Sequence, residues 1–69
     1  MRVPAIQVEL AEAEADLREV MERRRSAPLG DRVLLDGLDR SIELKRQRLT
    51  KLRLIAATLA RARLRTAVE

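Results

Sequence analysis

Apolar residues recur through the first third of the chain at alternating spacings of three and four. The set is Val3, Ile6, Leu10, Ala13, Leu17 and Val20, and Arg24 takes the next position. This spacing puts one residue in every turn on the same face of a helix and is the heptad seam of coiled coils. Pro4 suits the first turn of a helix, where its missing N–H has no partner to lose. We therefore predict a helix over about residues 4–25.

A second stripe, made of acidic residues, runs beside that seam. Its members are spaced 3-4-3 and are Glu9, Glu12, Asp16 and Glu19. Carboxylates on facing helices can hold a pair of metal ions, but such sites also use a Glu-x-x-His pair, and the chain has no histidine. We interpret the stripe as a solvated or salt-bridging face and expect no metal site.

The same 3-4 spacing returns in the second half of the chain. The seam there is Leu35, Leu38, Ile42, Lys45, Leu49, Leu52, Ala56 and Leu59. It predicts a helix over about 31–68, with the Asp31 carboxylate accepting from free N–H groups of the first turn. Gly37 leaves a second possibility, a turn at 31–36 followed by a helix from Gly37, because glycine weakens a helix interior. The unbroken phase of the seam favours one continuous helix.

The short segment 26–30 contains Pro28 and Gly30 and predicts a turn between the helices, which gives an antiparallel hairpin. Counting outward from this turn gives a register. The expected neighbours are Leu17 with Leu38, Ala13 with Ile42, Ile6 with Leu49, and Val3 with Leu52. The expected ion pairs are Glu9 with Arg46 and Asp16 with Arg40.

The two predicted helices differ in length, at about 33 Å and about 57 Å for a rise of 1.5 Å per residue. The second helix should therefore extend beyond the first by some fifteen residues, and that part is apolar on nearly every face. A helix that is apolar all round is normally buried. The residues expected to associate with a partner are Leu49, Leu52, Ile55, Ala56 and Leu59. We predict an all-α fold, a single hairpin domain over 1–69 that assembles into a four-helix bundle or larger helical oligomer.

Composition limits the chemistry. The 69 residues are 46% hydrophobic and include no Phe, Tyr, Trp, His, Cys or Asn. Without His or Cys, the usual catalytic bases, thiolate nucleophiles and commonest metal ligands are missing. We therefore expect no enzymatic activity and no cofactor. A core in a chain of this length rarely supplies more than about 3–5 kcal/mol, which favours oligomerisation or well-packed helices as the remaining source of stability.

Charge supports a second hypothesis. Residues 40–69 have a net charge of +7, whereas residues 1–22 have a net charge of −4. A basic helix can follow a phosphate backbone. The candidate phosphate contacts are Arg46, Arg53, Arg61 and Arg65. These arginines do not form one stripe, so a solvated helix that partly pairs with the acidic helix is the favoured interpretation.

The sequence thus predicts a non-enzymatic structural or interaction module that self-associates or docks into a larger assembly, for example a phage. A small nucleic-acid-binding or regulatory bundle is the alternative. Attachment to a membrane is disfavoured, because the basic residues are evenly spread and no aromatic anchors are present. With no signal-peptide pattern or apolar span, a cytoplasmic location is expected.

Overall fold

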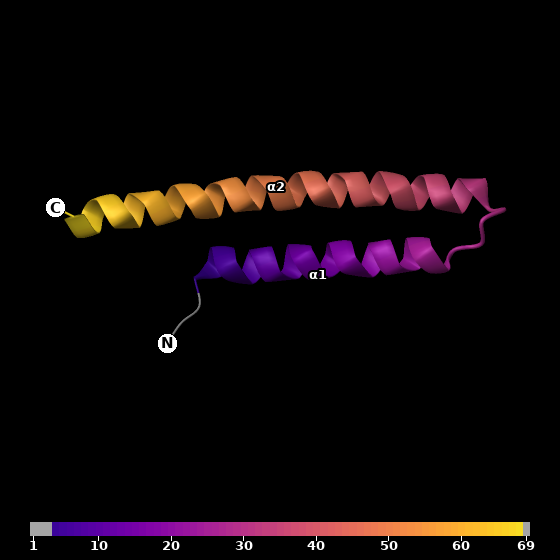
Figure 1. Cartoon of the computed structure of the whole chain (residues 1–69), viewed down its shortest axis with the longest axis horizontal. Helices are drawn as coiled ribbons and strands as arrows, with labels where there is room; N and C mark the ends of the chain where they lie inside the picture. The colour runs from indigo at the N-terminus through magenta and orange to yellow at the C-terminus, as the bar shows by residue number, and fades with distance from the viewer. Residues whose placement is uncertain (1–3, 69) are drawn as a thin grey trace.

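Both predicted helices are present in the computed structural model, which describes residues 4–68 and side chains through Arg65. Helix α1 spans Ala5–Ser26 and helix α2 spans Arg32–Val68. Figure 1 shows the two helices side by side and antiparallel, joined by one short connection. The described residues form no strand, so the all-α hairpin is confirmed, with helix ends within about one residue of those predicted.

Helix α1 begins directly after Pro4. The Pro4 carbonyl accepts hydrogen bonds from the backbone N–H of Gln7 at 2.9 Å and of Val8 at 3.3 Å. The helix ends because Ala27, the residue before Pro28, has extended backbone angles of φ −71° and ψ 143°. A residue before proline is driven out of the helical region by the proline ring.

Helix α2 is capped by Asp31, as the sequence predicts. The Asp31 Oδ1 accepts from the Leu34 N–H at 3.1 Å, and the Asp31 carbonyl accepts from the Leu35 N–H at 3.0 Å. The helix then continues through Gly37, which has no positive φ angle. Of the two alternatives, the continuous helix is therefore the one observed.

The core of the hairpin is a narrow seam between the helices. Ala13, Leu49 and Leu52 form its buried centre. Leu10 and Leu17 pack against this centre, and Val20 is buried closer to the turn.

The predicted register is wrong by about two helical turns. Ala13 was expected opposite Ile42, but it packs with Leu49 and Leu52 instead. The connection of residues 27–31, which begins with the extended Ala27, carries the chain past the end of α1 before α2 begins, so the first turn of α2 has no helix beside it (Figure 1). Val33 in that turn is exposed. The predicted contact of Val3 with Leu52 lies outside the described residues.

The shift in register also replaces the predicted ion pairs. In place of Glu9 with Arg46 and Asp16 with Arg40, two other pairs join the helices in the described part of the chain. They are Arg24 Nε with Asp39 Oδ1 at 2.8 Å, and Arg53 Nη2 with Glu14 Oε1 at 4.0 Å. Exposed pairs of this kind contribute about 0.2–1 kcal/mol each, so they follow the register set by the apolar seam.

Candidate association surface

The hairpin leaves an unusually large surface exposed. Its accessible area is 6031 Å², whereas a compact monomer of 7.9 kDa exposes about 4,400 Å². Its radius of gyration is 16.7 Å, against about 11 Å for a compact domain of this length. The excess of about 1,600 Å² is twice the roughly 800 Å² that one protein contributes to a standard interface. Two helices alone cannot cover each other's apolar sides.

The five residues expected to associate with a partner fall into two groups. Leu49 and Leu52 belong to the hairpin's own core, with 4% and 9% of their surface exposed. Ala56 is half-buried beside α1. Ile55 and Leu59 remain about half exposed although they are large apolar residues. Only this last pair is available to a partner molecule.

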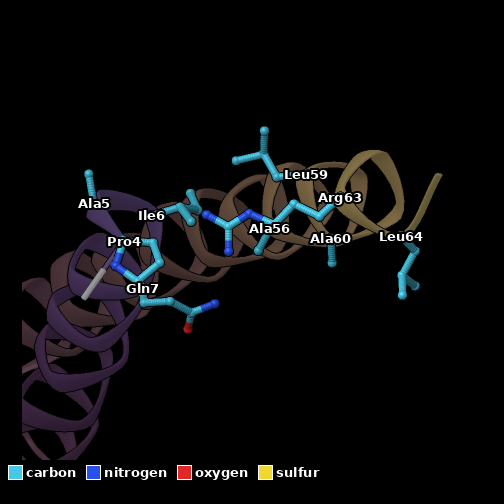
Figure 2. Close-up of a pocket in the computed structure, with 9 residues that line it drawn as sticks. All are labelled: Pro4, Ala5, Ile6, Gln7, Ala56, Leu59, Ala60, Arg63 and Leu64. Carbon is cyan, nitrogen blue, oxygen red and sulfur yellow. The ribbon is translucent and has the colours of Figure 1, made fainter. Parts of the chain in front are cut away.

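Ile55 and Leu59 belong to one side of the hairpin, which we call the Leu59 face and which carries exposed apolar residues toward both of its ends. At about 100° per residue, Leu44, Ile55 and Leu59 fall within an arc of about 60° on one flank of the α2 seam. The same projection puts Ala5 on the matching flank of α1, with Val8 at the outer edge of that flank. Figure 2 shows Ala5 and Leu59 pointing to the same side of the hairpin, whereas Gln7, Ala60 and Leu64 point to the other.

Val8 and Leu44 were not among the predicted association residues. Both are exposed, and both stand outside the heptad seams that guided the sequence prediction. A signal was nevertheless present, because Leu44, Ile55 and Leu59 share one flank once the seam is taken as the centre of the helix. Leu44, Ile55 and Leu59 thus form a second, interrupted set of apolar residues beside the seam.

The middle of the Leu59 face is charged. By the same projection Glu12 and Asp16 lie on it from α1, and Arg48 lies on it from α2, with Lys51 at its outer edge. Within the described residues none of these four side chains takes part in an ion pair. The face therefore presents separate acidic and basic groups that the hairpin itself leaves uncompensated.

The opposite side of the hairpin, which we call the Leu64 face, differs in this respect. Both ion pairs between the helices project to that side, since Glu14, Arg53 and Asp39 all lie on the flank that carries Leu64. Its cross-helix charges are thus partly neutralised within the chain. This contrast identifies the Leu59 face as the better interface for a partner.

An open groove lies where α1 begins beside α2 (Figure 2). Its lining residues are Pro4, Ala5, Ile6, Gln7, Ala56, Leu59, Ala60, Arg63 and Leu64. All but Gln7 and Arg63 are apolar, and the groove offers no acid, base or nucleophile arranged for catalysis. Its chemistry suits an apolar side chain from another helix.

The candidate phosphate contacts do not converge. Arg46, Arg61 and Arg65 are exposed, while Arg53 lies 4.0 Å from the Glu14 carboxylate. Helical projection spreads the first three over about 100° of the α2 surface. Even so, the segment from Leu44 to Val68 contains eight basic residues and no acid, so α2 is positive along most of its length.

Among the described residues, no group of three or more acidic side chains is placed to hold a metal ion, and this includes the acidic stripe of α1. Neither described helix has an apolar stretch sufficient to span a bilayer. Comparison of the chain with protein-family models, with curated proteins and with solved structures finds no match.

Proposed function

We propose that the chain is a non-enzymatic structural module that self-associates, with the Leu59 faces of two hairpins packing together as a four-helix bundle. The observation that carries this proposal is the exposed surface of 6031 Å², about 1,600 Å² more than a compact chain of this mass would leave. A second copy is the occupant that fits it, because a two-helix hairpin presents a side of the same length and the same composition.

Stability supports the same conclusion. Only Ala13, Val20, Leu49 and Leu52 are buried in the described part of the chain. Burying a large aliphatic side chain contributes about 1.5–3 kcal/mol, while ordering each residue costs about 1–2 kcal/mol. Four buried residues, one of them alanine, are too few to offset the ordering of two long helices. Burial of Leu44, Ile55 and Leu59 against another hairpin would add the missing contribution.

The proposal is tested by comparing variants that differ only in the face they alter. We expect the double variant Ile55→Asp/Leu59→Asp to shift the chain from dimer to monomer, measured by size-exclusion chromatography with light scattering. Leu54→Asp is the control, because Leu54 is exposed in the same helix turn but lies on another side. Loss of the dimer in the control alone, or no dimer for the unmodified chain, would contradict the proposal.

A second candidate function, binding to nucleic acid through α2, is favoured by one observation. The 25 residues from Leu44 to Val68 carry eight basic side chains without a single acid. Packing through the Leu59 face would leave Arg46, Arg61 and Arg65 on the outside of the bundle, where a phosphate backbone could reach them.

This second function predicts binding to duplex DNA or RNA that weakens steeply with added salt. Replacing Arg61 and Arg65 with Gln should reduce the affinity and lower the slope of log affinity against log salt by about two, one for each lost phosphate contact. Gel retardation at several salt concentrations measures both. If no duplex is retarded even at low salt, the nucleic-acid function is dismissed while self-association is unaffected.

A further inference from the structure

We propose that the two hairpins lie parallel, with both turns at the same end, so that α1 of each copy packs against α2 of the other. This inference rests on the proposed self-association and specifies its geometry. Two-fold symmetry permits two ways to stack the Leu59 faces. With the axis along the helices, α1 faces the other copy's α2. With the axis across them, like helices face each other.

Charge distinguishes these two arrangements. In α1 the segment from Ala5 to Glu22 has six acids and one basic residue, whereas α2 from Leu44 to Val68 has eight basic residues and no acid. Stacking α1 on α1 and α2 on α2 would bring like charges together along the whole bundle. The parallel arrangement instead puts every acidic helix between two basic ones, which gives complementary potentials across the interface.

The acidic groups of α1 and the basic groups of α2 also lie at the same level along the bundle axis. Ala13 packs with Leu49, and Glu14 lies by Arg53, so Arg48 is level with the segment between Glu12 and Asp16. In a parallel dimer the two copies stand at equal height. Arg48 of one copy therefore meets Glu12 and Asp16 of the other, on the face where all three lack an ion-pair partner in the described hairpin.

Within each hairpin these charged side chains lie next to side chains of the same charge, which is unfavourable. Glu12 and Asp16 are four residues apart on one helix face, a spacing at which two carboxylates repel each other. Arg48 and Lys51 stand three residues apart in the same way. A second hairpin in the parallel arrangement relieves both repulsions together, whereas a stack of like helices would increase them.

The apolar residues of the Leu59 face are also level with each other in the parallel arrangement. Ile6 borders a groove whose other wall includes Ala56 and Leu59, so the start of α1 is level with that part of α2 (Figure 2). Ala5 and Val8 of one copy would then cover Ile55 and Leu59 of the other. Apolar residues meet apolar residues and acids meet bases in one arrangement, without a shift along the axis.

The absence of cysteine makes the geometry directly measurable, because a single introduced cysteine takes a spin label at one site only. We choose Leu29→Cys in the exposed turn and Arg65→Cys near the other end of α2. Electron–electron double resonance on each labelled dimer then reports the distance between equivalent ends of the two copies.

The parallel arrangement predicts a distance under about 30 Å for both labelled variants, since helices in a bundle lie about 8–10 Å apart. A hairpin 60 Å long gives much longer distances at both ends if the copies are antiparallel. Long distances in a chain that sediments as a dimer would overturn the arrangement and leave self-association intact. A chain that is monomeric at every concentration would overturn both.

Charge reversal provides an independent readout. Arg48→Glu should weaken the dimer about tenfold, because each dimer contains two such contacts and each reversal replaces attraction with repulsion. Adding Asp16→Arg in the same chain should restore most of the affinity. Arg46→Glu is the matched control on the Leu64 face and should change the affinity less than Arg48→Glu. An equal effect of Arg46→Glu and Arg48→Glu would contradict the assigned face.

Discussion

Two leucines of α2 show how the position of a residue on a helix decides its contribution to stability. Leu49 is 4% exposed and Leu54 is 61% exposed, although they are five residues apart in one helix. The first closes the seam against Ala13, and the second has water on most of its surface. The difference follows from helical phase alone, because both have the same side chain and the same helix propensity.

We predict that Leu49→Ala lowers the free energy of unfolding by about 2–5 kcal/mol, the usual loss for a buried leucine. Leu54→Ala should change it by less than about 0.5 kcal/mol. Urea unfolding followed by circular dichroism at one fixed protein concentration measures both, and the fixed concentration matters because association adds to apparent stability. Equal losses for the two variants would mean that the core has been misplaced.

At the scale of the element, the helices follow from the sequence but their register does not. The 3-4 spacing, Pro4 and the Asp31 cap place each helix end within about one residue. Register depends instead on the backbone angles of the connection. Ala27 is extended, and the connection of residues 27–31 that it opens sets where α2 begins relative to α1. No apolar pattern encodes this, because both seams repeat every seven residues and fit equally well after a shift by one such repeat.

The candidate surface was predictable only in part for the same reason. Ile55 and Leu59 are exposed, while Leu49 and Leu52 are buried in the hairpin's own core. Leu44 joins the surface because it lies on a flank of α2 that α1 leaves uncovered. Which side chains are left uncovered is a property of the pair of helices, so neither seam alone could show it.

The continuity of α2 can be tested at the one weak position in its sequence. Gly37 lies in the helix interior, so Gly37→Pro should destabilise the hairpin by about 3 kcal/mol or more. If a helix instead began at Gly37, proline there would be tolerated as a first-turn residue. Thermal unfolding monitored by circular dichroism distinguishes the two results.

Gly37→Ala supplies the matched control for that variant. A methyl group at this position meets no atom within 4 Å, so the change adds helix propensity without a clash. We expect a gain of about 1 kcal/mol in stability. A loss on both substitutions would show that glycine itself is required there, and a gain on both would show that the helix is broken.

At the scale of the whole molecule, the hairpin is a bar of 60 × 22 × 12 Å with one helix acidic and the other basic over most of their shared length. A body 12 Å thick is a single layer of helices and has no interior of its own beyond the seam. Domains are normally built from two or more packed layers. A second hairpin supplies the missing layer, and the charge pattern supplies its orientation.

Sedimentation equilibrium of the unmodified chain from low micromolar to millimolar concentration tests whether the hairpin associates with itself. We expect a mass of twice the 7.9 kDa of one chain, with a melting temperature that rises with protein concentration. A fully helical species that stays at 7.9 kDa and melts at the same temperature throughout that range would contradict it.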